Sequence, residues 1–282
     1  MHTFPAPDGT VLAFHESGAG EPLICLPGGP MRASAYFGDL GGLADAGHRV
    51  VRLDLRGTGA SGVPADPSSY RVDRLVDDVE ALREYLGLER IRLLGHSAGA
   101  ALATLYTARL PERVSELVLV TPAVGTTGGE VTPQDRLDVA RLRDGEPWFP
   151  EAYAAMETIA AGEATAADWE AAAPLSHGRW DETAREHRAA GAAQRNPEAA
   201  AGHDAPGAYD PADVRAALSA FRGRTLVVAA EYDVAAPPGP VTAAARAYPG
   251  ATTVVLPRAG HFPWHDSPEE FTAAVTSFLA GA

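Results

Sequence analysis

The chain has 282 residues, of which 46% are hydrophobic, and a formal net charge of −14. This is enough for one large α/β domain with an insertion, or for two smaller domains. The acidic balance argues against nucleic acid as a partner, because phosphates require a basic face. The first residues do not resemble a secretory leader, and no apolar run reaches the roughly 20 residues of a membrane helix. We therefore expect a cytoplasmic protein that does not bind membranes.

The single cysteine, Cys25, excludes an internal disulfide framework and a cysteine-based zinc site. Its apolar neighbours predict a buried strand residue without a catalytic role. The sequence does not indicate an oligomeric state.

The elements alternate along the chain. Near the start, Asp8-Gly9 separates two short extended stretches and predicts a hairpin turn. Short apolar runs predict buried strands at 22–26, 49–53, 91–94, 117–120, 225–229 and 252–256. Helical spacing or composition predicts helices at 36–46, 72–86, 98–110 and 268–279. Strands that alternate with crossover helices predict a mostly parallel sheet covered by helices on both faces.

The strand pattern is interrupted once. From about residue 125 to about residue 208 the chain is rich in alanine and acidic residues, which favours helices. We therefore predict an α/β core formed by 1–124 and 209–282, with 125–208 as an inserted helical lid.

The most informative motif is Gly95-His96-Ser97-Ala98-Gly99, which follows the predicted strand 91–94 and opens the helix 98–110. A strand, a G-x-S-x-G sequence and a helix in this order are typical of a nucleophile elbow. The turn is so tight that only glycine fits two residues before and after the serine. Ser97 would lie at a helix N-terminus, which favours developing negative charge.

Two further residues follow strands at the same predicted edge of the sheet. Asp233 comes after the strand 225–229, and His261 after the strand 252–256. Functional groups gather beyond the carboxyl ends of strands in open α/β sheets, and the order Ser, Asp, His is expected for a triad built on an elbow. His261 would remove the serine proton, and Asp233 would hold the imidazole tautomer. Asp266 and Asp210 are alternatives for the acid, but neither directly follows a strand.

The triad also needs donors for a tetrahedral oxyanion. The first is the backbone N–H of Ala98, which follows the nucleophile. The second is expected from Pro27-Gly28-Gly29-Pro30, in which the prolines have no N–H to donate. This leaves Gly29, with Gly28 as the alternative.

With these parts the chain resembles α/β-hydrolases, and within them the proline iminopeptidase-like serine hydrolases. The segments that carry the resemblance are Leu26-Pro27-Gly28-Gly29-Pro30 (similar to an HGGP loop), Asp54-Leu55-Arg56-Gly57-Thr58-Gly59-Ala60-Ser61 (D-x-R-G-x-G-x-S), the elbow, and Gly260-His261-Phe262-Pro263-Trp264. The match to the peptidase branch is looser, because Pro27 replaces the usual histidine and Met31 replaces a glycine.

Several other polar residues have simpler interpretations. Asp54 and Arg56 are more typical of a loop pinned beside the sheet than of catalysis. His96 lies too close to Ser97 along the chain to act as its base. His261 and His265 have the i, i+4 spacing of a metal pair, but Pro263 breaks that geometry, so we expect no metal.

The lid would determine substrate specificity. Its aromatic and acidic residues either line the pocket or hold the lid together, and the candidates for substrate binding are Trp148, Tyr153, Trp169, Glu170 and Trp180. The lid carries more than half of the net negative charge, which would suit a free amino group on the substrate. Asp168-Trp169-Glu170 resembles the amine-binding lid residues of iminopeptidases. Solvated helix faces are the alternative that we favour.

The expected function is hydrolysis of a carboxylic ester or amide through an acyl-enzyme on Ser97, without a cofactor. The substrate would be a small molecule or a short peptide, and removal of an N-terminal proline is the most specific version. Esterase, lactonase, thioesterase and carbon–carbon bond hydrolase activities are alternatives. A protein that only binds a small molecule is a more remote one.

Overall fold

The computed structural model describes residues 1–281. Its centre is an eight-stranded sheet in the order β1-β2-β4-β3-β5-β6-β7-β8. The strands are β1 (His2–Pro5), β2 (Val11–Ser17), β3 (Pro22–Leu26), β4 (Arg49–Asp54), β5 (Ile91–His96), β6 (Val114–Val120), β7 (Arg224–Ala230) and β8 (Thr252–Leu256). β2 pairs antiparallel with β1 and β4, whereas β3 to β8 run parallel. This is the mostly parallel sheet that the alternation of elements predicts.

The helices follow the strands along the chain. They are α1 (Val72–Tyr85), α2 (Ala98–Arg109), α3 (Pro133–Arg141), α4 (Phe149–Ala160), α5 (Ala166–Ala171), α6 (Glu182–Gln194), α7 (Pro197–His203), α8 (Pro211–Leu218), α9 (Pro238–Ala244), α10 (Pro263–Asp266) and α11 (Pro268–Ala280). Within residues 1–281, no helix is both long and apolar enough to span a bilayer.

The core lies on both faces of the sheet, because alternate strand residues point to opposite sides. On one face Ile24 and Leu93 pack with residues of α1, α2, α8 and α9. On the other face Leu23 and Leu94 pack with residues of α11 and with Tyr36. Since both faces are covered, polar groups of the core can reach solvent mainly at the ends of the strands.

One predicted helix is wrong. Residues 36–46 do not form an α-helix; two short 3₁₀ helices, Ser34–Phe37 and Leu40–Gly42, occupy the start of this segment. Gly38, Gly41 and Gly42 all have positive φ, between 57° and 91°. A left-handed residue interrupts the α-helical hydrogen-bond pattern, so these three glycines break the helix that the apolar spacing suggested.

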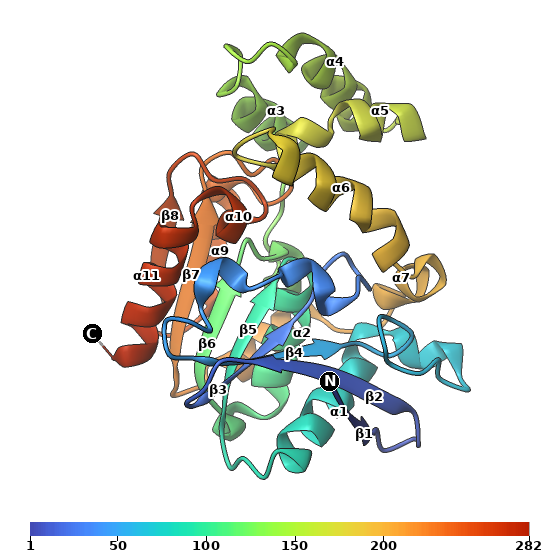
Figure 1. Ribbon diagram of the computed structural model, residues 1–282, viewed down its shortest axis with the longest axis vertical. Helices are drawn as coiled ribbons and strands as arrows, with labels where there is room; N and C mark the ends of the chain where they lie inside the picture. The colour runs from blue at the N-terminus through green and yellow to red at the C-terminus, as the bar shows by residue number, and fades with distance from the viewer. Residues whose placement is uncertain (282) are drawn as a thin grey trace.

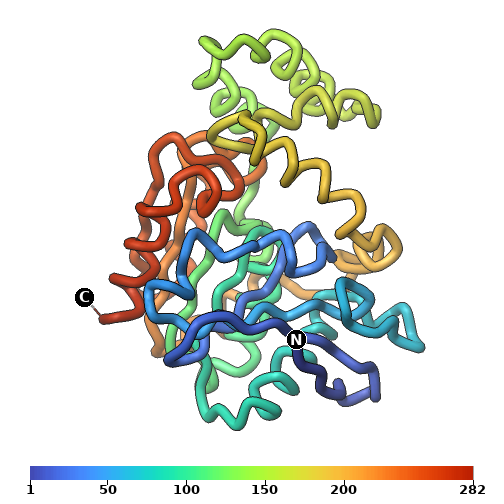
Figure 2. Tube along the Cα trace, in the orientation of Figure 1, coloured from blue at the N-terminus to red at the C-terminus, as the bar shows by residue number. Residues whose placement is uncertain are grey.

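The segment between β6 and β7 leaves the core and returns to it (Figures 1 and 2). Figure 1 shows α3, α4 and α5 as a group that projects above the sheet, followed by α6, which descends toward α7. The group has its own small core, which includes Val139, Met156 and Leu175 and packs on Val234 just after β7. α8 packs on α2 instead and lies with the central core.

Candidate active site

Ser97 lies at the junction of β5 and α2 in a strained conformation. Its φ is 53° and its ψ is −118°, values that a non-glycine residue rarely adopts. The neighbouring glycines have no room for a side chain. A Cβ at Gly95 would lie 2.5 Å from the Gly99 carbonyl oxygen, and a Cβ at Gly99 would collide with the Leu26 carbonyl oxygen. The backbone therefore forms the tight strand-to-helix turn that the motif predicts.

His261 and Asp233 form a hydrogen-bonded pair. The distance from His261 Nδ1 to Asp233 Oδ2 is 2.8 Å, and Asp233 is fully buried. The other carboxylate oxygen accepts the N–H groups of Ala235 and Ala236, at 2.8 and 3.0 Å. Because the carboxylate only accepts, Nδ1 carries the proton in a neutral imidazole, and Nε2 is left as a base.

A second network of hydrogen bonds, which is buried, connects His96, the residue before Ser97, to His261. His96 Nε2 is 2.9 Å from the His261 carbonyl oxygen, which accepts only, so Nε2 carries the proton. Burial, and then the charge of His261, hold the pKa of His96 well below its usual value, so the ring is neutral. Its Nδ1 therefore accepts a hydrogen bond from the Tyr36 hydroxyl at 2.7 Å. That hydroxyl in turn accepts the Gly28 N–H at 2.8 Å.

We call Gly28, Tyr36, His96 and His261, joined in this order, the relay. Every donor and acceptor in it has one consistent role, so the four residues fix a single His96 tautomer. The relay links the loop after β3, the residue before Ser97 and the backbone of His261. It therefore sets the relative positions of three segments that are distant in the sequence.

The relay also distinguishes between Gly28 and Gly29, the two candidates for the second oxyanion donor. The Gly28 N–H is already used by Tyr36. Within residues 1–281, the backbone N–H groups of Gly29 and Ala98 donate to no other protein group. A Cβ at Gly28 would lie 2.9 Å from Ser97 Cβ and 3.2 Å from the Ala98 nitrogen, so this loop adjoins the nucleophile. The two unused donors thus belong to Ala98, which follows Ser97, and to Gly29, which follows the glycine that adjoins it.

Comparison with known proteins shows the family of the chain. The family model described as the alpha/beta hydrolase fold matches residues 21–268. The chain belongs to this family. A proline iminopeptidase from Heyndrickxia coagulans is 37% identical over 112 residues, which cover 39% of this chain and 38% of that protein. The chain thus aligns with well under half of the length of that relative.

Two matches within the alpha/beta hydrolase family cover nearly the whole chain. A 2-hydroxy-6-oxo-6-phenylhexa-2,4-dienoate hydrolase from Comamonas testosteroni is 26% identical over 277 residues, covering 95% of this chain and 91% of that one. The crystal structure of a proline iminopeptidase from Mycobacterium smegmatis superposes with a TM-score of 0.72, at 25% identity, over 99% of this chain and 98% of that chain. The family therefore includes more than one reaction on this architecture.

Asp54 and Arg56 make structural contacts. Asp54 accepts the backbone N–H groups of Ser34 and Ala60 at 2.8 and 2.9 Å. Arg56 is buried and forms two hydrogen bonds to Asp78, which is also buried. These contacts hold the loop after β4 against α1.

The two alternative acids have other partners. Asp210 caps the N-terminus of α8. Asp266 accepts the backbone N–H groups of Gly178 and Gly260, both at 2.8 Å, and burial raises its pKa. Asp266 therefore joins the lid to the loop that carries His261, and His261 N–H donates to the Ser176 carbonyl at 2.9 Å beside it.

The lid residues predicted to bind substrate make contacts with other residues of the lid. Trp148 lies under the Arg143 guanidinium at 4.9 Å, and the Tyr153 ring packs tilted against Phe149, with ring centroids 5.0 Å apart. Trp169 is 55% exposed, and Glu170 pairs with Arg188 on the surface. Trp180 packs on His177, with ring centroids 5.5 Å apart. None of these contacts involves Ser97, Asp233 or His261.

The lid contributes histidines that the sequence did not single out. His177 Nε2 lies 3.1 Å from His187 Nδ1, and the His187 ring is 4.3 Å from Phe262, the residue after His261. Burial is the main cause that lowers the pKa of His177 to about 4 and that of His187 to about 2. No sequence signal marks these residues, because only the return of α6 to the sheet edge brings them to Phe262. In the described part of the chain, no cluster of His, Cys, Asp or Glu is arranged to hold a metal.

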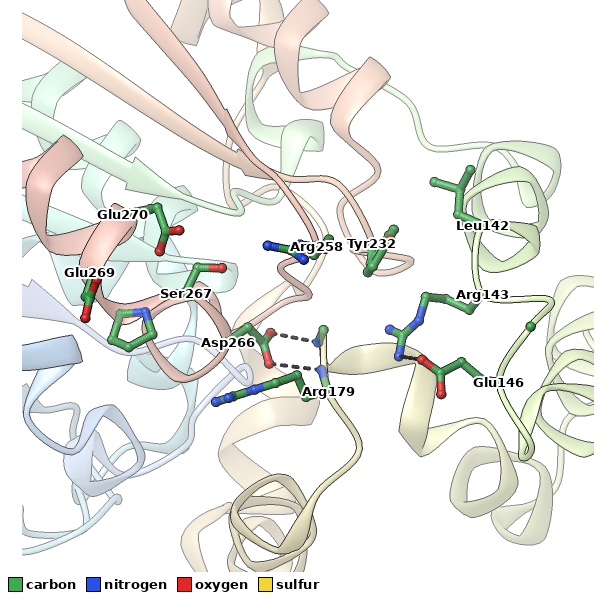
Figure 3. Close-up of a pocket in the computed structure, with 13 residues that line it drawn as sticks. Leu142, Arg143, Glu146, Arg179, Tyr232, Arg258, Asp266, Ser267, Glu269 and Glu270 are labelled. Atoms are coloured by element: carbon green, nitrogen blue, oxygen red, sulfur yellow. Dashed lines mark hydrogen bonds and ion pairs between the residues drawn. The ribbon is translucent and has the colours of Figure 1, made fainter.

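A cavity of about 730 Å³ lies between the lid and the loops after β7 and β8 (Figure 3). Figure 3 shows Arg258 and Tyr232 on one side and Arg143 with Glu146 on the other, with Asp266 bonded to the lid backbone. Its lining does not include Ser97, Asp233 or His261.

Proposed function

We propose that the chain is a serine hydrolase that cleaves a carboxylic ester or amide of a small substrate through an acyl-enzyme on Ser97. The observation that carries the proposal is the strained backbone of Ser97 together with His261, whose ring lies 4.8 Å from that of His96 and whose Nδ1 is bonded to a buried carboxylate. A serine held this way has its hydroxyl exposed at a helix N-terminus. A nucleophile, a base and an orienting group are the parts that acyl transfer requires.

In the first half of the reaction, His261 Nε2 takes the proton of the Ser97 hydroxyl as Oγ attacks the substrate carbonyl carbon. The carbonyl electron pair moves to oxygen, which becomes an oxyanion. When the intermediate collapses, the bond to the alcohol or amine breaks, and His261 returns the proton to that leaving group. Asp233 stabilises the imidazolium that exists between these steps.

In the second half, water replaces the leaving group. His261 removes one proton from water as the oxygen attacks the acyl carbon. The new intermediate expels Ser97 Oγ, which recovers the proton from His261, and the acid product leaves. The enzyme is thereby restored with no net change.

The oxyanion is held by backbone donors in both halves. We assign them to Gly29 and Ala98, because the alternative, Gly28, already donates to Tyr36. Fixed donors of this kind stabilise the transition state without reorganisation, and each is worth about 3 kcal/mol. The proposal keeps residues 125–208 as the lid and 1–124 with 209–282 as the core.

The substrate class is a finer question. Proline iminopeptidase activity is supported by the partial match to such enzymes and by the similar solved structure. The acidic lid gives it no further support: Asp168 caps the N-terminus of α5, and Glu170 is exposed and paired with an arginine. Carbon–carbon bond hydrolysis is the second candidate, because the Comamonas relative aligns over almost the whole chain. Ester hydrolysis requires no catalytic group beyond the nucleophile, the base, the acid and the oxyanion donors. We therefore use ester turnover as the activity with which the others are compared.

The test is turnover of a panel of nitrophenyl acyl esters and aminoacyl anilides, including proline anilide, by the parent, Ser97→Ala and His261→Ala proteins. We expect ester turnover by the parent and its near-complete loss in both variants. Proline anilide turnover would establish the peptidase version. Full activity in folded Ser97→Ala would refute the proposal, and so would a protein that binds acyl compounds but turns none over.

A further inference from the structure

Arg32 is a buried cation without an anionic partner among the described residues. Its exposed fraction is 6%, and no carboxylate within residues 1–281 lies within ion-pair distance of it. Burial, followed by the charges of Arg195 and Arg188, lowers its pKa to about 10, so it remains charged at neutral pH. An unpaired charge away from water is costly, and proteins normally supply a counterion.

The guanidinium has fixed neighbours on three sides. It lies over the Tyr36 ring, 4.6 Å from the centroid. Nε donates to Gln194 Oε1 at 2.8 Å, and Nη2 donates to the His187 carbonyl at 3.1 Å, both on α6. Nη1 donates to no group in the part of the chain that the structure describes. The side chain is thus held in one orientation with one donor group unused.

Arg32 also lies next to the acyl-transfer site. A Cβ at Gly29 would be 2.8 Å from Arg32 Cβ, and Arg32 N–H donates to the Gly28 carbonyl at 3.1 Å. These two glycines carry the loop that adjoins Ser97. Tyr36, on which the guanidinium stacks, belongs to the relay. The cation is therefore one short loop away from the nucleophile.

The part of α6 that faces Arg32 has no side chain at one position and adds a polar atom at another. Gly191 lies against the guanidinium, and a Cβ there would be in van der Waals contact with it at 3.8 Å, so the glycine leaves the room of one methyl group. His187 Nε2 is buried and has no hydrogen-bond partner within residues 1–281. Its ring also contacts Phe262, the residue after His261. An anion that bonds to Arg32 between the loop and α6 would bring the missing counterion.

We propose that Arg32 is a substrate-binding residue that accepts a carboxylate at the far end of the acyl chain. The preferred substrates are then esters or amides of dicarboxylic acids, with one carboxyl group free. This deepens the proposed function and rests on it. A free amino group would be repelled at this position, which separates the proposal from an amine-binding lid.

A pair of reagents tests the subsite and the nucleophile separately. One is an alkyl fluorophosphonate whose six-carbon chain ends in a carboxylate, and the other is its methyl ester. Ser97 Oγ attacks phosphorus in both, fluoride leaves, and His261 takes the proton. The second-order labelling rate is followed by intact mass in the parent protein and in Arg32→Gln.

We expect the parent to react with the anionic reagent at least about tenfold faster than with the methyl ester, as for hydrogen bonds to a charged group. Arg32→Gln should abolish this preference, so that the ratio of the two rates falls to about one whatever the change in the rate with the methyl ester. Arg185→Gln, which removes an exposed arginine from α6, the helix that Arg32 contacts, should keep the preference. Arg32→Lys, which keeps the charge but not the contacts to α6, should retain part of it.

Other results overturn the inference. Equal rates with both reagents in the parent would refute the carboxylate subsite and leave the serine hydrolase intact. An equal loss with both reagents in Arg32→Gln, with the ratio preserved, would show that Arg32 only tethers α6. No labelling of Ser97 by the methyl ester in folded parent protein would refute the proposed function itself, and the subsite with it.

Discussion

Tyr36→Phe should disturb the active site by removing a single oxygen atom. The ring is buried and stays in place, so packing is almost unchanged, but two polar groups lose their partner: the Gly28 N–H and His96 Nδ1. A buried group left without its hydrogen bond costs about 1 to 3 kcal/mol. Two such groups in one network predict a loss of about 2 to 6 kcal/mol in the free energy of unfolding.

The same substitution should slow the chemistry. Without the Tyr36 hydroxyl, nothing fixes which nitrogen of His96 carries the proton, and the tautomer with a proton on Nδ1 cannot donate to the His261 carbonyl. The freed Gly28 N–H also allows the oxyanion loop to shift. Because displacements of about 1 Å can cost about a hundredfold in rate, we expect labelling of Ser97 to slow by at least about tenfold.

Urea unfolding and fluorophosphonate labelling measure the two effects. Tyr248→Phe is the matched control, because its hydroxyl is also buried but bonds only to Thr104, which has a second partner in the Ala100 carbonyl. It should cost about 1 kcal/mol and leave labelling unchanged. A Tyr36→Phe protein as stable and as reactive as Tyr248→Phe would refute the positioning role of the relay.

Three further predictions concern the acid, the oxyanion loop and the lid. Asp233→Asn should lower kcat by about a thousandfold or more, because the amide favours the wrong His261 tautomer; a larger loss in Asp266→Asn would show that Asp266 is the acid. Gly28→Ala should slow Ser97 labelling at least about tenfold, because its Cβ would lie 2.6 Å from the His96 carbonyl oxygen. Gly145→Ala is the control, since a Cβ there has no atom within 4 Å, and it should leave labelling unchanged. Equal effects of the two substitutions would contradict the close approach. In the unfolded chain His187 gains a proton as the pH falls below the ordinary histidine pKa of 6.5, but in the folded protein it does so only near a pKa of about 2. The parent should therefore lose about 2 kcal/mol of stability from pH 7 to pH 5 that His187→Asn does not lose. Urea unfolding at the two pH values measures this, and an equal loss of stability in both proteins would contradict it.

The sheet and the elbow were predictable because their signals are local. An apolar run such as Leu117 to Val120 specifies a buried strand without reference to the rest of the chain. The two glycines of the elbow, Gly95 and Gly99, can be read from the sequence directly, and they are there because no side chain fits at either position. The positions of Asp233 and His261 followed from a rule about strand ends. Their hydrogen bond of 2.8 Å is a finding of the structure.

The relay and the Arg32 contacts were not predictable in the same way. Gly28, Tyr36, His96 and His261 are distributed over more than 200 residues, and no periodicity relates them. Tyr36 also lies in the segment where apolar spacing predicted a helix that the glycines prevent. Arg32 depends on α6 for two of its hydrogen bonds, so its role requires the fold of the lid.

The lid was predicted as helices, but its side chains were not placed. Helical composition favours helices between β6 and β7 without indicating which face of each helix meets the core. Trp169 was a candidate for substrate binding and is exposed, whereas His187 was not considered and lies against Phe262. Composition does not distinguish the two positions, because their difference arises from how α6 returns across the sheet edge.

Detection of an acyl group on Ser97 is the most direct test of the central claim. The parent protein is mixed with a slowly hydrolysed nitrophenyl ester, quenched in acid during turnover and digested with trypsin. Ser97 is the only serine in the tryptic peptide 93–109, so a mass increase by one acyl group on this peptide, fragmented to Ser97 and absent in His261→Ala, is the predicted result. Turnover with the acyl group on another residue, or turnover that persists in Ser97→Ala, would contradict the account.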